Sequence, residues 1–166
     1  GATGTFDLGE ISAKITSITP ENQSLLQIGF VLTVAAFAFK VAAAPFHFWA
    51  PDVYEGSPTP VTAYMVTVVK VAAFAALLKF FQAFQGAIPT TVAWVVYGLC
   101  FLTLMVANFI AASQKNVKRL MAYSSISHTG FMLIGIFCQG EGAQNLLVYY
   151  GLVYGIASLT AFRVLW

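Results

Sequence analysis

Long apolar runs separated by short polar turns make up most of the chain. A helix needs about 20 mainly apolar residues to cross the hydrocarbon core of a bilayer, and the runs are of that order of length. The pattern therefore predicts an all-α, polytopic transmembrane helix bundle with about five spans. The expected spans cover residues 25–50, 60–84, 88–112, 117–138 and 146–166.

The first expected span is interrupted by Ala42-Ala43-Ala44-Pro45. Proline lacks a backbone N–H and clashes with the preceding helical turn, so it kinks or breaks a helix. We therefore expect this span to be discontinuous at Pro45. The following segment, residues 51–58, is expected to be a loop that turns the chain towards the second span.

Residues 1–23 differ from the rest because they are polar and rich in Gly, Thr and Ser. Ile11, Ile15 and Ile18 give them a short amphipathic stretch, so they are expected to lie at the membrane interface, with residues 24–166 forming the bundle. The start has no basic region followed by an apolar core, so it does not read as a signal peptide. The last residues stop inside an apolar run, and the chain is expected to be an internal piece of a longer membrane protein.

Composition supports a membrane location, since 59% of residues are hydrophobic and only 8% are charged, against about 25% charged in soluble domains. The mean hydropathy is +0.81. A net charge of +2 without a Lys/Arg-rich block argues against nucleic-acid binding. Cys100 and Cys138 lie inside apolar runs and are interpreted as small buried hydrophobic residues. With no GxGxxG, CxxC or haem-spaced histidine pair, no cofactor or metal is expected in this chain.

The turn at residues 113–119 contains Lys115, Lys118 and Arg119, whereas the turn at 139–145 is acidic. Because basic residues accumulate on the cytoplasmic side of membrane proteins, the 113–119 turn is expected to be cytoplasmic. With five crossings, the 51–58 loop shares that side and the other turns lie outside. The expected location is the inner (plasma) membrane of a cell.

Lys40 and Lys70 each lie within a long apolar run. An ionisable side chain at membrane depth is costly and commonly marks a path for ions or protons. Burial disfavours the charged form of a lysine, which would allow it to give up and regain a proton. The alternatives are a lysine that snorkels to the interface or forms a static ion pair, and Lys79 fits the first of these.

Two sequence strings carry a resemblance. FKVAAAPFHFWAPDVYEGSPTPVTAYMVTVVK is followed by QKNVKRLMAYSSISHTGFML, with a thirty-residue spacing between the two lysines. Together and in this order they resemble subunit N of respiratory complex I, one of the antiporter-like membrane subunits of proton-translocating NADH:quinone oxidoreductase. The resemblance extends over about residues 25–162.

This resemblance implies particular roles for three residues. Lys40 matches the central lysine beside a helix break, Lys70 the bridging lysine on the next helix, and His128 a polar relay position. The family's partner glutamate and later lysine are not in this chain. NADH and quinone are used by the whole complex, so the implied partners are other membrane subunits and the lipid bilayer.

Other side chains are expected to support this relay. His128 follows Ser124 by four residues on the same helix face, with Ser127 adjacent, and an imidazole among hydroxyls can pass protons through water. A purely structural histidine that joins two helices is the alternative. His47 is expected to pack and hydrogen bond near the break at Pro45.

Asp52 is interpreted, with Glu55, as an acidic residue at the cytoplasmic mouth or as one that caps a helix and binds the turn. The expected function is therefore proton translocation by Lys40, Lys70 and His128, coupled to quinone reduction in other subunits. Two alternatives stay open: a subunit of a stand-alone cation/proton antiporter, and a structural membrane bundle without transport.

Overall fold

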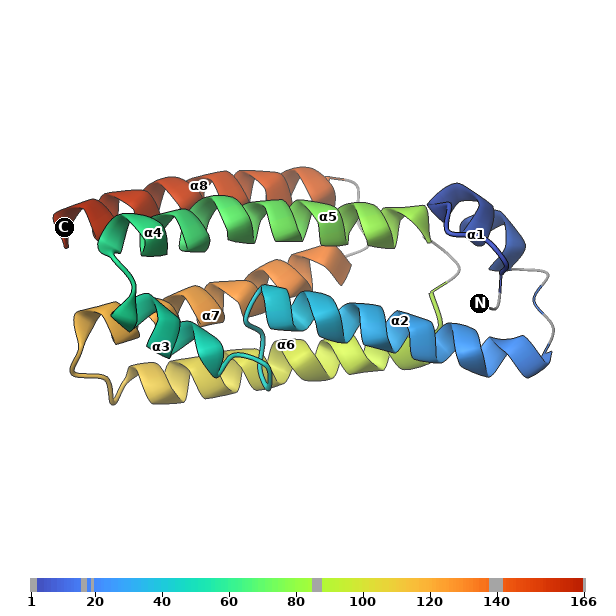
Figure 1. Ribbon diagram of the computed structural model, residues 1–166, viewed down its shortest axis with the longest axis horizontal. Coiled ribbons are helices and arrows are strands. Elements are labelled where there is room, and N and C mark those ends of the chain that lie inside the picture. The colour runs from blue at the N-terminus through green and yellow to red at the C-terminus, as the bar shows by residue number, and fades with distance from the viewer. Residues whose placement is uncertain (1–2, 16–17, 19, 85–87, 138–141, 166) are drawn as a thin grey trace.

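The computed structural model describes residues 3–15, 18, 20–84, 88–137 and 142–165, and all regular secondary structure in these ranges is helical (Figure 1). This confirms the predicted all-α class. The elements are α1 (Leu8–Ile15), α2 (Pro20–Lys40), α3 (Trp49–Gly56), α4 (Thr59–Tyr64), the π-helical turn η1 (Met65–Val69), α5 (Lys70–Ala83), α6 (Thr90–Ala111), α7 (Val117–Phe137) and α8 (Ala143–Val164).

The long helices run roughly along one axis, in two groups. Helices α4, η1 and α5 follow one another as a single rod beside α8, whereas α2, α6 and α7 lie on the other side of the bundle (Figure 1). The short helix α3 packs beside the first half of α7. The N-terminal end and the C-terminal end lie at opposite ends of the bundle (Figure 1).

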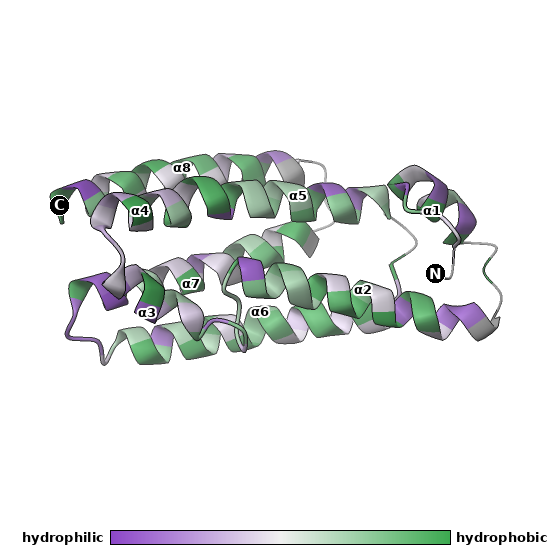
Figure 2. Ribbon diagram, viewed as in Figure 1, coloured by the Kyte–Doolittle hydropathy of each residue, from purple (hydrophilic) through white to green (hydrophobic). Residues whose placement is uncertain are grey.

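Within the described ranges, four helical stretches are long and apolar enough to cross a membrane: Asn22–Lys40, Thr59–Ala83, Thr90–Ala111 and Asn145–Val164. Helix α7 is of similar length, 21 residues, and lies alongside them. Figure 2 shows hydrophilic colour at the start of α7, next to the turn that follows α6. The helix pattern agrees with a polytopic bundle, while a fifth crossing by α7 stays a prediction.

The predicted discontinuity of the first span is confirmed, and it begins before the proline. Ala42 has φ = 59°, in the left-handed region, so the right-handed helix cannot continue through this residue. The N–H of Ala42 donates to the carbonyl of Phe39 at 3.1 Å, and that of Ala43 to the carbonyl of Ala38 at 2.8 Å. These two bonds form a Schellman C-cap, so the backbone ends α2 at Lys40.

The prediction of a loop over residues 51–58 was wrong for most of that segment, because residues 49–56 form α3. Pro51 lies in the first turn of this helix, where the missing N–H would have had no intrahelical partner. Ser57 is extended, with ψ = 152°, as expected for a residue before a proline. The chain therefore turns at Ser57 and Pro58 rather than over the whole segment.

The N-terminal segment contains α1, in which no residue is buried. Ile11 and Ile15 nevertheless pack on their inner side against the hydrophobic core. Asp7 accepts a hydrogen bond from the N–H of Glu10 at 3.0 Å and so caps the helix start. Cys100 is buried, as predicted, whereas Cys138 lies outside the described residues.

Candidate functional site

Lys70 is the first residue of α5, directly after the π-helical turn η1, and only 3% of it is exposed. Single π turns occur frequently at functional sites. Its ammonium nitrogen Nζ donates to the carbonyl of Ser125 at 2.9 Å and to Thr129 Oγ1 at 3.0 Å. It also donates to Ser125 Oγ. An ammonium has three N–H donors, so these contacts satisfy all of them.

Thr129 connects Lys70 to the break after α2. Its Oγ1 accepts from Lys70 and donates to the carbonyl of Val41 at 2.9 Å, with the carbonyl of Ser125 as a second acceptor at 3.2 Å. On the opposite helix, Thr103 Oγ1 accepts from the N–H of Ala44 at 3.0 Å. A broken helix frees backbone groups that need partners away from water, and these two buried threonines supply them.

Close packing of α6 against α7 depends on Gly130, next to Thr129. A Cβ atom at this position would lie 2.7 Å from the Cγ of Leu104 on α6. Any side chain larger than hydrogen would therefore push Leu104 or α6 away. The glycine therefore lets α7 lie close to α6 at the position next to Thr129.

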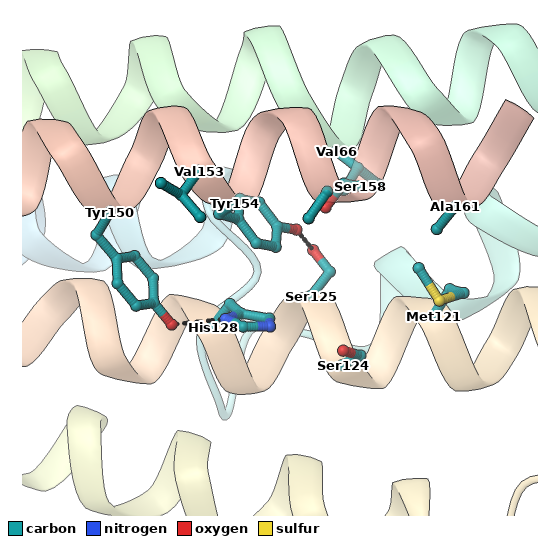
Figure 3. Close-up of a pocket in the computed structure, with 11 residues that line it drawn as sticks. Val66, Met121, Ser124, Ser125, His128, Tyr150, Val153, Tyr154, Ser158 and Ala161 are labelled. Carbon is teal, nitrogen blue, oxygen red and sulfur yellow. Dashed lines mark hydrogen bonds between the residues drawn. The ribbon is translucent and has the colours of Figure 1, made fainter.

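A pocket of about 330 Å³ lies between α7, α8 and η1 (Figure 3). His128 lines it, and its Nδ1 is 2.6 Å from the hydroxyl of Tyr150. The hydroxyl of Tyr154 donates to Ser125 Oγ at 2.8 Å, and the ring of Tyr154 lies 4.8 Å from that of His128. Ser124 lines the same pocket, as its spacing from His128 predicts.

The charge of Lys70 is not neutralised by a carboxylate within this chain's described part. There, the ion pairs join Lys14 to Glu10 and Arg119 to both Asp52 and Glu55. The described hydrogen bonds of Lys70 all go to hydroxyl or carbonyl oxygens. Polar groups of this kind hold an ammonium without fixing its charge as a nearby carboxylate would.

Asp52 belongs to a separate polar cluster, in which α3 meets the start of α7. Arg119 donates to Asp52 at 2.7 Å and to Glu55 at 2.9 Å. Asn116 donates to Glu55 at 2.6 Å, and Lys118 donates to the carbonyl of Ser57 at 3.2 Å. We call these residues the Arg119 cluster. The segments 51–58 and 113–119 therefore meet at the same end of the bundle.

The remaining predicted site residues lie apart from Lys70 and His128. Lys40 is the last residue of α2, and its side chain is exposed on the surface of this chain. Pro45 follows Ala44 within the break. His47 is buried, its ring lies 4.5 Å from that of Phe48, and its Nδ1 has no hydrogen-bond partner among the described residues. Ser127 turns towards α6 and donates to Asn108 at 3.3 Å.

The structure brings four further residues to the site: Ser125, which the sequence suggested as a water ligand without ranking it, and Thr129, Tyr150 and Tyr154, which it did not single out. Their spacing is a signal that could have found them. Ser125 and Thr129 are four residues apart, as are Tyr150 and Tyr154, so each pair shares one helix face. Polar stripes on apolar helices indicate contacts between helices.

No group of three or more His, Cys, Asp or Glu residues that could hold a metal ion occurs in the ranges that the structure describes. The site instead consists of one buried amine, an imidazole and several hydroxyl groups. This set of groups can hold a proton at Lys70 or His128 and pass it along hydroxyls or water.

A family model described as NADH:quinone oxidoreductase/Mrp antiporter, transmembrane, matches residues 1–165. The chain belongs to this family. Among its relatives in the family, subunit N of the NADH-quinone oxidoreductase of Myxococcus xanthus is 46% identical over 89% of this chain, and that of Chloroflexus aggregans is 46% identical over 99%. The chain spans 29% and 34% of the lengths of these two relatives.

Two solved members of respiratory complexes have a similar fold. A chain of respiratory complex I from Thermus thermophilus superposes with a TM-score of 0.73 at 37% identity, over 95% of this chain and 38% of that one. A chain of an archaeal membrane-bound sulfane sulfur reductase gives a TM-score of 0.84 at 28% identity, over 98% and 33%. The resemblance drawn from the two sequence strings is therefore confirmed at the level of the family.

Proposed function

We propose that this chain translocates protons across a membrane as part of an NADH-quinone oxidoreductase. In this proposal Lys40, Lys70 and His128 hold and pass the protons, while NADH oxidation and quinone reduction take place in other subunits. The relatives named NADH-quinone oxidoreductase subunit N support this choice. The other membrane subunits and the lipid bilayer are the proposed partners.

One observation carries the proposal: Lys70 is buried, and among the described residues its ammonium contacts only uncharged oxygens. A buried amine without a carboxylate partner can exist with or without its proton, because neither form is fixed by an opposite charge. A carboxylate that approached either lysine would hold the proton there, and its withdrawal would release it. If the approach and withdrawal of the carboxylate were timed with quinone reduction, protons would move in one direction.

Lys40 has a different place in this proposal. It ends α2 just before the break, and the carbonyl of the next residue, Val41, accepts the hydrogen bond of Thr129. Thr129 in turn contacts Lys70. The two lysines are therefore linked through one threonine and the backbone of the break, although the side chain of Lys40 lies on the exposed face of this chain.

The test uses membranes that contain the complete oxidoreductase with the full-length subunit. Lys40→Ala and Lys70→Ala are compared with wild type for NADH-driven proton uptake and quinone reduction. Lys79→Ala is the matched control, since Lys79 is an exposed lysine of α5. We expect both activities to fall in the first two variants while the complex remains assembled. Unchanged proton uptake in the Lys70→Ala variant would overturn the proposal.

A cation/proton antiporter is a second candidate, because the matching family description also names the Mrp antiporter. The same variants separate the two functions. Cation-driven proton exchange in vesicles without NADH, lost in Lys70→Ala, would favour the antiporter. Dependence of proton uptake on quinone reduction would favour the oxidoreductase.

We also propose that the Arg119 cluster lies on the cytoplasmic side of the plasma membrane, because the 113–119 turn holds three of the eight basic residues. Single cysteines introduced at Lys115 and at Pro58 would then react with a membrane-impermeant thiol reagent only from the cytoplasmic side. Labelling from the opposite side would reverse the orientation.

A further inference from the structure

Lys70 does not line the pocket around His128, although its hydrogen bond to Ser125 Oγ links it to that pocket. Ser125 is the residue that the two have in common. It lines the pocket, and its hydroxyl oxygen accepts a hydrogen bond from Lys70. Only 2% of Ser125 is exposed, so the contact lies inside the bundle.

The three acceptors around Lys70 differ in whether they can pass on a proton. The carbonyl of Ser125 has no hydrogen to give. The hydroxyl of Thr129 has one, but it is directed to the carbonyl of Val41 or of Ser125, and neither carbonyl can transmit it. Thr129 also does not line the pocket. Among the described contacts, Ser125 Oγ is therefore the acceptor that can relay a proton from Lys70 towards the pocket.

The far side of the pocket holds a group that can receive this proton. His128 Nδ1 faces the hydroxyl of Tyr150, while the other ring nitrogen lies on the side of the ring towards Ser124 and Ser125 (Figure 3). When Nδ1–H donates to Tyr150, the lone pair of Nε2 is free to accept a proton. A pocket of about 330 Å³ has room for water between the two groups.

We propose that the hydroxyl of Ser125 is the proton relay between Lys70 and the pocket. The inference deepens the proposed function and rests on it. The Nζ–H bond of Lys70 breaks as an O–H bond forms at Ser125, while the original hydroxyl hydrogen of Ser125 passes to a water molecule in the pocket. That water gives one proton to Nε2 of His128. Lys70 becomes a neutral amine, His128 an imidazolium, and Ser125 is regenerated.

Two isosteric variants test this role in the complete oxidoreductase. Ser125→Thr keeps a hydroxyl. Ser125→Val introduces a side chain of the same shape as threonine but without the hydroxyl, and it leaves no space for a substituting water. Both retain the backbone carbonyl that Lys70 contacts. We expect NADH-driven proton uptake in the valine variant to be about 10²-fold lower than in the threonine variant, as for the loss of a positioned proton-transfer group. Equal rates in the two assembled variants would overturn the inference.

Ser125→Ala covers the case in which neither larger side chain allows assembly. It leaves space for water, so we expect a partial loss of proton uptake together with a larger solvent isotope effect in D₂O. A rate and an isotope effect equal to those of wild type would contradict the relay. Ser113→Ala is the matched control, because Ser113 is exposed and its hydroxyl donates to the carbonyl of Ile110 at the end of α6.

The Lys70→Ala variant separates the inference from the proposed function. If Lys70→Ala abolishes proton uptake while Ser125→Val does not, the relay through Ser125 fails and the role of Lys70 stands. If Lys70→Ala leaves proton uptake unchanged, the proposed function fails and the relay fails with it. Loss in both variants, with recovery in Ser125→Thr, is the expected result.

Discussion

Lys70 and Arg119 are both cations in contact with several acceptors, but their surroundings are of opposite kinds. Lys70 is 3% exposed and contacts two hydroxyls and a carbonyl. The side chain of Arg119 is 32% exposed and contacts the carboxylates of Asp52 and Glu55. The buried cation thus has neutral partners, whereas the accessible one has charged partners.

The partners of the two cations suggest different roles: Lys70 could lose its charge, whereas the charge of Arg119 joins two helices. An arginine remains protonated, and two carboxylates stabilise it further, so the Arg119 cluster fixes α3 against the start of α7. Neutral oxygens impose no such constraint on Lys70. Under the proposed function, the interior of the bundle would transfer protons, whereas the ion pairs at its polar end join α3 to α7.

The largest effect is expected when Lys70 is made unable to lose its charge. Lys70→Arg keeps a cation that cannot be deprotonated in a protein, so proton uptake by the assembled oxidoreductase should fall about 10²-fold. The reverse exchange, Arg119→Lys, should leave proton uptake within about twofold, because Arg119 lies outside the proposed relay and lysine keeps a positive charge beside Asp52 and Glu55. Normal proton uptake in the Lys70→Arg variant would show that Lys70 acts only as a fixed charge.

Removal of the Thr129 hydroxyl should have the next largest effect, on stability. Thr129→Val leaves the buried carbonyl of Val41 and one donor of Lys70 without this partner, at a cost of about 1–3 kcal/mol. The free energy of unfolding of the full-length subunit in detergent micelles measures this change. Thr129→Ser retains the hydroxyl and serves as the control. A valine variant as stable as the serine variant would show that this link is unimportant.

A smaller effect is expected at the accessible cluster. Arg119→Gln removes both ion pairs, and exposed pairs contribute little and are screened by salt. Amide hydrogen exchange of residues 49–56 should therefore be faster in the variant at low ionic strength. The difference from wild type should shrink in high salt. Identical exchange at low salt would show that other contacts hold α3 in place.

The smallest effect is expected at Ala42. Glycine relieves the left-handed conformation by about 1–2 kcal/mol, but Ala42→Gly also loses a buried methyl group worth about 0.8 kcal/mol. The net change in the free energy of unfolding should thus be about 1 kcal/mol or less. Ala43→Gly is the control, because this alanine is equally buried without a positive φ. It should be clearly destabilised, and equal losses in both variants would argue against strain at Ala42.

The apolar pattern predicted the helices well because burial in a membrane or a bundle needs long continuous runs. The expected spans at 60–84 and 88–112 agree closely with Thr59–Ala83 and Thr90–Ala111. The short helix α3 was missed because its proline and its two charged residues are typical of a loop. It is held in place by contacts with α7, including those of Arg119, and α7 lies far away in the sequence.

The site was predicted only in part, for a similar reason. Lysines and histidines in apolar runs are rare enough to attract notice, so Lys70 and His128 could be selected directly. Threonines and tyrosines are common in transmembrane helices, and their type alone does not distinguish a relay from a packing contact. Ser127 and Ser125 are two residues apart, yet one faces Asn108 and the other faces Lys70. Helix rotation decides between them.

The sequence by itself determined the all-α class, the extents of the long helices after residue 58, the break near Pro45 and the family, because each depends on local composition or on an ordered string of residues. Tertiary structure alone decided that Lys70 is buried and Lys40 exposed on this chain, and that Thr129 joins Lys70 to the break. Burial and hydrogen bonding depend on which helix faces meet, and that follows from packing between residues far apart along the chain.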